Sequence, residues 1–198
     1  MLNLTEFLIK EYKVHRKYKG KDCLYSEDNQ NRYYFFKKIE GIDNNKKATV
    51  VMINPSDAKY KADEKAEFPD ATIQNLYKIL EHTKNFSSFE VVNLYSQIDT
   101  NPKVLDKKVE DKLNYEIVKY VLKNAETIIP AWGIGRNYEK KINDILKIIK
   151  ENNKEDKIEI VVNRYPSHFA PYCTSINRNP KFEKIKINEI EDVLNNSL

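Results

Sequence analysis

Residues 48–57 read ATVVMINPSD, an apolar run that is followed at once by a polar turn. The β-branched residues of the run favour a strand over residues 48–53. Residues 54–57 then end the strand, because Pro fixes φ and because Asn and Asp bond to the local backbone. The rest of the fold can be worked out from this strand and its turn.

Strand and helix patterns alternate from this run onward. Strands are predicted over residues 48–53, 89–94, 127–131 and 157–162, and helices over residues 71–82, 106–123 and 138–151. Strands separated by helices of this length run parallel, and right-handed crossovers put helices on both faces of the sheet. The sequence therefore predicts an α/β fold, a three-layer α/β/α sandwich with a four-stranded parallel sheet core.

The segments around this core carry other patterns. An amphipathic helix is expected near the N-terminus, an antiparallel edge hairpin before the first parallel strand, and helical turns near the C-terminus. These are placed at residues 2–12, at residues 32–39 paired with 48–53, and within residues 182–194. The length favours a single domain over residues 1–198, with an N-terminal helical extension (1–31), a core (32–172) and a C-terminal segment (173–198).

The composition limits where the protein works. Hydrophobic residues make up 40% and charged residues 32% of the chain, and no apolar run approaches the roughly 20 residues that cross a bilayer. Charges at Glu6, Lys10 and Glu11 interrupt the N-terminal apolar pattern, which a secretory signal would not tolerate. Cys23 and Cys173 lack both zinc-site spacing and disulfide density. We expect a cytoplasmic protein without a membrane partner, and the net charge of +4 permits nucleic-acid binding without demonstrating it.

Amides, hydroxyls and aromatic residues follow each expected parallel strand. In open parallel sheets the ligand lies beyond the carboxyl ends of the strands, so these positions are the candidate site. The four segments are Asn54-Pro55-Ser56-Asp57, Asn93-Leu94-Tyr95-Ser96, Ala131-Trp132-Gly133-Ile134-Gly135-Arg136 and Asn163-Arg164-Tyr165-Pro166-Ser167-His168.

Each candidate also has a purely structural interpretation. Asn54 is also typical of a turn, and Asn93 could simply hydrogen-bond to a loop and hold it in place. A lone tryptophan such as Trp132 is often a core residue. Gly133 and Gly135 fit a tight turn as well as close approach to a phosphate. The carboxylates Asp57, Asp63, Asp70 and Asp99 would form a hard-metal site only if at least two of them met, and no metal or cofactor is assigned.

Together the segments resemble an uncharacterised bacterial family, the domain of unknown function 1643. The resemblance covers about residues 32–172, and its matching pieces are Arg32-Tyr33, Val51 through Ala58, Asp70-Ala71-Thr72-Ile73, Val92-Asn93-Leu94, Asp99 through Pro102, Ala131-Trp132-Gly133 and His168. The chain departs from the family pattern in a longer charged insert at residues 59–69 and at His168-Phe169, where the family tends to have His-Pro.

That family is similar in turn to the uracil-DNA glycosylase superfamily, which shares the α/β sandwich and the motif positions. The resemblance implies that Asn54 positions the attacking water, as in the Asn-Pro motif of mismatch-specific glycosylases, and that Asn93 reads a flipped base. The superfamily's His-Pro-Ser motif is here Tyr165-Pro166-Ser167. The His is thus replaced by Tyr165 or displaced to His168, which puts uracil as the substrate in doubt.

Glycosidic-bond hydrolysis requires a held water, a grip on an unstacked base and contacts to flanking phosphates. Every role has candidates. The assigned sets are catalytic Asn54, Asp57 and His168; base-binding Asn93, Tyr95, Trp132 and Tyr165; and phosphate-binding Ser56, Gly133, Gly135, Arg136 and Ser167.

Three functions remain open at this point. The leading hypothesis is a metal-independent, glycosylase-like enzyme that releases a modified or mismatched base from DNA. The second is a non-catalytic nucleic-acid or nucleotide binding module of the same fold, which the altered fourth motif favours. The third is a metal-dependent or free-nucleotide hydrolase that uses the carboxylates.

Overall fold

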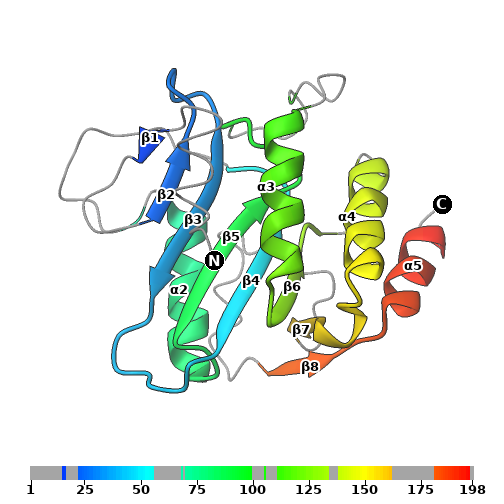
Figure 1. Cartoon of the computed structure of the whole chain (residues 1–198). Coiled ribbons are helices and arrows are strands. Elements are labelled where there is room, and N and C mark those ends of the chain that lie inside the picture. The colour runs from blue at the N-terminus through cyan, green and yellow to red at the C-terminus, as the bar shows by residue number, and fades with distance from the viewer. Residues whose placement is uncertain are drawn as a thin grey trace.

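A mixed β-sheet flanked by helices forms the protein (Figure 1). The computed structural model describes residues 15–16, 22–55, 68, 70–99, 105, 111–133, 138–161 and 181–196. In these residues one sheet has six strands in the order β1 (His15–Arg16), β2 (Asp22–Tyr25), β3 (Arg32–Lys38), β5 (Ser88–Asn93), β4 (Lys47–Met52) and β6 (Thr127–Ala131). The α/β class predicted from the sequence is confirmed.

The parallel part of the sheet has three strands where the sequence predicted four. β4 pairs in parallel with β5 on one side and with β6 on the other. In the part of the chain that the structure describes, the expected fourth strand joins the sheet through a single parallel bridge between Ile128 and Ile158. Beyond this bridge β7 (Glu159–Val161) pairs antiparallel with β8 (Phe182–Lys184) as a separate two-stranded sheet. The prediction of a four-stranded parallel core was therefore wrong.

The predicted hairpin of residues 32–39 with 48–53 was also wrong, because β5 lies between β3 and β4. β3 pairs antiparallel with β5, in the register Phe35 with Val91, and its other edge pairs with β2. The physical reason is the carboxylate of Glu90 on β5, which is almost fully buried. It accepts hydrogen bonds from Tyr34 Oη on β3 at 2.9 Å and from Thr49 Oγ1 on β4 at 2.7 Å. Both bonds require β5 in the middle.

α2 (Ala71–Thr83) and α3 (Lys112–Lys123) begin at polar caps; α2 starts where the periodicity predicted, whereas α3 starts at Lys112 and the prediction had residue 106. α2 begins at Asp70, whose Oδ1 accepts from the N–H of Ile73 at 2.8 Å, and it ends at Lys84 in the left-handed conformation. α3 begins at Asp111 in the same way. α4 (Glu139–Glu151), the short 3₁₀ helix η2 (Glu155–Lys157) and α5 (Ile187–Asn196) complete the described helices. The N-terminal helix expected at residues 2–12 lies outside the described residues.

Two apolar clusters, one on each face of the sheet, give the molecule three layers. One cluster joins α2 to Val50, Met52, Phe89 and Val91, and the other joins α3, α4 and α5 to the opposite side chains of the same strands. Figure 1 shows α2 on one face of the sheet and α3 and α4 on the other. Among the described residues no helix is long and apolar enough to cross a membrane.

Candidate functional site

The carboxyl ends of β4, β5 and β6 meet at one edge of the sheet. Met52 is the register partner of Asn93 on one side and of Ala131 on the other, so the three strands end at the same level. The chain leaves β4 toward α2 on one face, and it leaves β5 and β6 toward α3 and α4 on the opposite face. Such a reversal beside a central strand is the topological switch point at which open α/β sheets bind ligands.

Five of the predicted site residues lie at or beside this edge. They are Asn54, Asn93, Tyr95, Trp132 and Gly133. The other seven, Ser56, Asp57, Gly135, Arg136, Tyr165, Ser167 and His168, lie outside the described residues. The site is therefore built here from the first five and from their neighbours.

The side chain of Asn54 is tied to the loop that follows β5. Its Nδ2 donates to the main-chain oxygen of Asp99 at 2.8 Å. The backbone adds a second link, since the N–H of Asp99 donates to the oxygen of Pro55 at 3.3 Å. The amide of Asn54 is thereby held in a fixed orientation at the end of the central strand.

Asn93 presents a buried amide whose polar atoms have no partner in the described part of the chain. Its side chain is 0% exposed, and neither Oδ1 nor Nδ2 finds a hydrogen-bond partner there. Phe89 and Val91 belong to the α2 cluster, so strand alternation turns Asn93 toward the same face. A buried amide without partners costs free energy, which makes Asn93 the most unusual group at this edge.

Arg32 and Asp70 form a buried ion pair near the same edge and on the same face. Arg32 Nη1 lies 2.8 Å from Asp70 Oδ2, and the two side chains are 1% and 2% exposed. The pair joins the start of β3 to the N-cap of α2. The Nε of Arg32 has no hydrogen-bond partner among the residues described. The sequence reasoning treated Arg32 only as part of the family resemblance, although a lone Arg opening an apolar aromatic run was a usable signal.

Neither Cys23, which lies beside this ion pair, nor Asp70, which belongs to it, is a reactive group. Cys23 is fully buried, and this burial raises the pKa of its thiol to about 12 even though the positive charge of Arg32 opposes the shift. The thiol therefore stays protonated at neutral pH and is not a nucleophile. Asp70 uses both oxygens, one for the cap of α2 and one for Arg32, so it is a poor candidate for the metal site considered above.

Trp132 lies in the apolar core, and Gly133 makes a tight turn. The Trp132 side chain is 1% exposed and belongs to the cluster under α3 and α4. Its Nε1 has no partner in the described residues. Gly133 has a φ of 72°, in the left-handed region that favours glycine. This geometry matches the structural interpretations of both residues, and a stacking role for Trp132 requires the ring to become accessible.

Tyr95 belongs to a half-buried aromatic group beside α4. Its ring packs edge-to-face against Tyr138 with 6.1 Å between centroids, and Lys141 Nζ lies 5.8 Å from the Tyr95 centroid. Burial raises the pKa of Tyr95, and the neighbouring Tyr138 and Asp144 raise it further. Tyr95 therefore remains a protonated hydroxyl in neutral solution.

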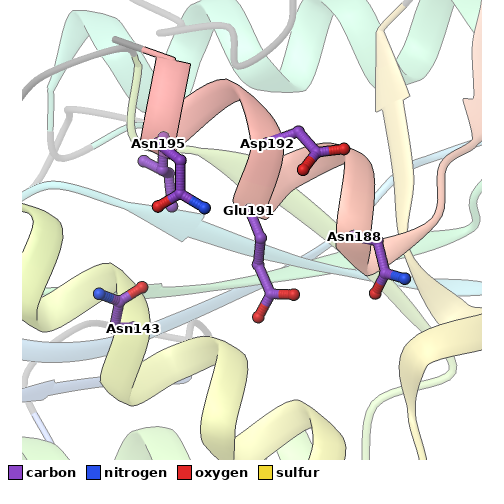
Figure 2. A pocket seen from close by; sticks show the side chains of 6 residues that line it. Asn143, Asn188, Glu191, Asp192 and Asn195 are labelled. Carbon is purple, nitrogen blue, oxygen red and sulfur yellow. The ribbon is translucent and has the colours of Figure 1, made fainter. Parts of the chain in front are cut away.

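A polar cavity of about 450 Å³ lies elsewhere, between α4 and α5 (Figure 2). Figure 2 shows Asn143 on α4 and Asn188 and Glu191 on α5 along this cavity. Glu191 is already paired with Lys150 Nζ at 2.5 Å. None of the predicted site residues lines the cavity, so its size alone gives it no functional assignment.

Comparison with known proteins gives one match. A profile of the family described as "Protein of unknown function (DUF1643)" matches residues 32–169, which is well over half of the chain. No curated protein and no solved structure matches. In the described residues no group of three or more His, Cys, Asp or Glu side chains gathers as a metal site would require.

Proposed function

We propose, from the premise that this chain belongs to the DUF1643 family of proteins of unknown function, that it hydrolyses the N-glycosidic bond of a modified or mismatched base in DNA. The observation that carries the proposal is the buried amide of Asn93, with one donor atom and one acceptor atom unpartnered in the described residues. A nucleobase edge offers an adjacent donor and acceptor, which an Asn side chain can satisfy with two hydrogen bonds.

The neighbouring Arg32 supports the same class of ligand. Its unpartnered Nε–H, on the same face as Asn93, adds a donor for a carbonyl or ring acceptor. Because Asn93 has no exposed surface, a base reaches it only when the residues that cover it move. Base-flipping enzymes likewise grip an extruded base in a closed pocket. This arrangement fits the proposed kinship with the uracil-DNA glycosylase superfamily.

In the proposed reaction, Asn54 holds the water at the end of β4. Its link to the Asp99 carbonyl fixes the amide, as a preorganised group requires. The water oxygen bonds to C1′ while the bond from C1′ to the base nitrogen breaks, and the departing base keeps the electron pair. Asp57 stabilises the cationic centre and accepts the proton that the attacking water loses, while His168 or Tyr165 supplies a proton to the departing base. Tyr95 and Trp132 pack with the cluster under α3 and α4, on the face opposite the Asn93 side chain, so Asn93 and Arg32 provide the grip on the base. Ser56, Gly133, Gly135, Arg136 and Ser167 hold phosphates.

Replacing Asn54 with alanine tests this mechanism. We expect base release to fall on the order of a hundredfold with little change in DNA binding, because the group acts mainly in the transition state. Base release is measured on duplexes that carry a panel of modified bases, alongside the melting temperature. As a matched control, Asn44→Ala removes an exposed amide that donates to the main-chain oxygens of Lys84 and Asn85 and accepts from Lys46 N, and it should leave the rate unchanged.

The opposite pattern would remove Asn54 from the mechanism. If its bond to Asp99 only ties the loop, the variant should lose roughly 1 kcal/mol of stability for one hydrogen bond. Base release by the folded fraction would then be normal. That result favours the second candidate, a binding module of the same fold without chemistry, since the Asn54 to Asp99 bond serves a loop tie equally well.

Both candidates predict that DNA binding weakens with salt. The net charge of +4 suits contact with about three phosphates, so raising the salt from about 50 to 200 mM should lower the affinity by roughly tenfold to fiftyfold. Fluorescence anisotropy with a labelled duplex measures this. An affinity that is independent of salt would argue against DNA as the partner and in favour of a free nucleobase or nucleoside.

A further inference from the structure

A small crevice between α3 and α4 carries features that the proposed function does not use. It lies at the end of β5, with a volume of about 10 Å³, and its lining includes Asn114, Tyr115, Lys141 and Asp144. A volume of this size accepts about one water molecule. Any occupant is therefore a single small group.

Asn114 fixes the polarity of this crevice. Its Nδ2 donates to the main-chain oxygens of Asn93 at 3.0 Å and Leu94 at 3.3 Å. The amide cannot be turned round without setting Oδ1 against two carbonyl oxygens, so the orientation is determined. Oδ1 is then the buried atom without a partner in the described residues, on a side chain that is 4% exposed. The crevice therefore presents Asn114 Oδ1 as a hydrogen-bond acceptor, and a bound group would have to be a hydrogen-bond donor.

The surroundings favour a positively charged donor over a neutral one. Asp144 lines the crevice, and in the described part of the chain no Lys or Arg lies within salt-bridge distance of its carboxylate. Tyr115, which is 38% exposed, also lines the crevice, and aromatic rings attract cations. Lys141 is the one positive group in the lining, and its ammonium lies over Tyr95.

We propose that this crevice binds an ammonium group, either the free ion or the end of a primary amine, held by Asn114 Oδ1 and the Asp144 carboxylate. The group donates one N–H to the amide oxygen and pairs its charge with Asp144. Bound there, it links α3 and α4 to the end of β5, because Asn114 already holds the main chain of Asn93 and Leu94. Asn93 also lines the crevice, but strand alternation turns its side chain toward α2, so the two proposed sites share this residue and lie on opposite faces of the sheet.

Thermal melting of the full chain in ammonium chloride and in tetramethylammonium chloride, at equal ionic strength, tests the proposal. Tetramethylammonium has the same charge but is too large for the crevice. Ammonium at about ten times its Kd should raise the Tm by about 3–6 °C relative to tetramethylammonium. Methylammonium should act like ammonium.

Three variants make the result specific. Asp144→Asn should abolish the difference between the two salts. Lys141→Met should enlarge it at low ammonium concentration, because a competing positive charge is removed. Asp192→Asn, which removes a carboxylate on α5, is the matched control and should behave like the unaltered chain. Equal melting in the two salts for both the unaltered chain and Lys141→Met would mean that the crevice holds only water, and the proposal would be overturned.

Discussion

Replacing Arg32 with methionine is expected to lower the free energy of unfolding by about 3–5 kcal/mol, the usual cost of removing one partner from a buried ion pair. Asp70 keeps its charge in this variant and stays buried at the N-cap of α2. The carboxylate has then lost its guanidinium, and only the N-terminal end of the helix still stabilises it. Urea unfolding followed by circular dichroism measures the loss.

Asp70→Asn is the control that separates the contribution of the Asp70 charge from the contribution of its hydrogen bond at the N-cap of α2. Asn caps helices as well as Asp does, so this variant keeps the bond to Ile73 N and removes only the charge that faces Arg32. The double variant Arg32→Met with Asp70→Asn leaves no unpaired charge and should recover part of the stability lost in Arg32→Met. If Arg32→Met costs less than about 1 kcal/mol, as for an exposed pair, the buried pair does not hold β3 to α2.

Replacing Glu90 with valine should cost about 2–6 kcal/mol, the second large effect. The change removes the acceptor of two buried hydroxyl donors, Tyr34 and Thr49, each worth about 1–3 kcal/mol when its acceptor is lost. It also removes the contact with Lys47 Nζ at 2.9 Å. Chemical denaturation at neutral pH gives the magnitude.

Glu90→Gln is the matched variant. Its Oε1 can accept from one hydroxyl and its Nε2–H can donate to the oxygen of the other, so one hydroxyl keeps its acceptor while the charge attraction to Lys47 is lost. Its cost should stay near 1 kcal/mol. Equal losses in the valine and glutamine variants would show that the charge on Glu90, and not its hydrogen bonds, stabilises the sheet.

Helices α2 and α4 and the parallel strands β4, β5 and β6 could be predicted because their signals are local. The pattern over residues 71–82 reproduces α2, and that over residues 138–151 reproduces α4 to within one residue. The partner of β3 could not be predicted in this way, because it depends on where the Glu90 carboxylate finds its donors. Because β3 and β4 are neighbours in the sequence, a hairpin between them was predicted. In the structure the hydrogen bond from Tyr34 to Glu90, 56 residues away, pairs β3 with β5 instead.

For the candidate site too, the positions of the residues could be predicted from the sequence, whereas the contacts of their side chains could not. Strand ends are visible in the sequence, so Asn54, Asn93 and Trp132 could be placed at one edge of the sheet. The environment of each side chain is not visible. The bond from Asn54 to Asp99 and the burial of Trp132 depend on segments distant in the chain. Asn114 was missed because nothing local marks a helix residue that reaches back to a strand end.

The position of β5 between β3 and β4 has a consequence for the order in which the chain is made. Residues 32–52 are made before residues 88–93, and until β5 is made both β3 and β4 lack the strand that lies between them in the finished sheet. Unpaired strand edges attract other strands, and for these two the nearest is each other. The nascent chain therefore has to keep β3 and β4 apart, or separate them again, until β5 arrives with the Glu90 carboxylate that both flanking strands bind.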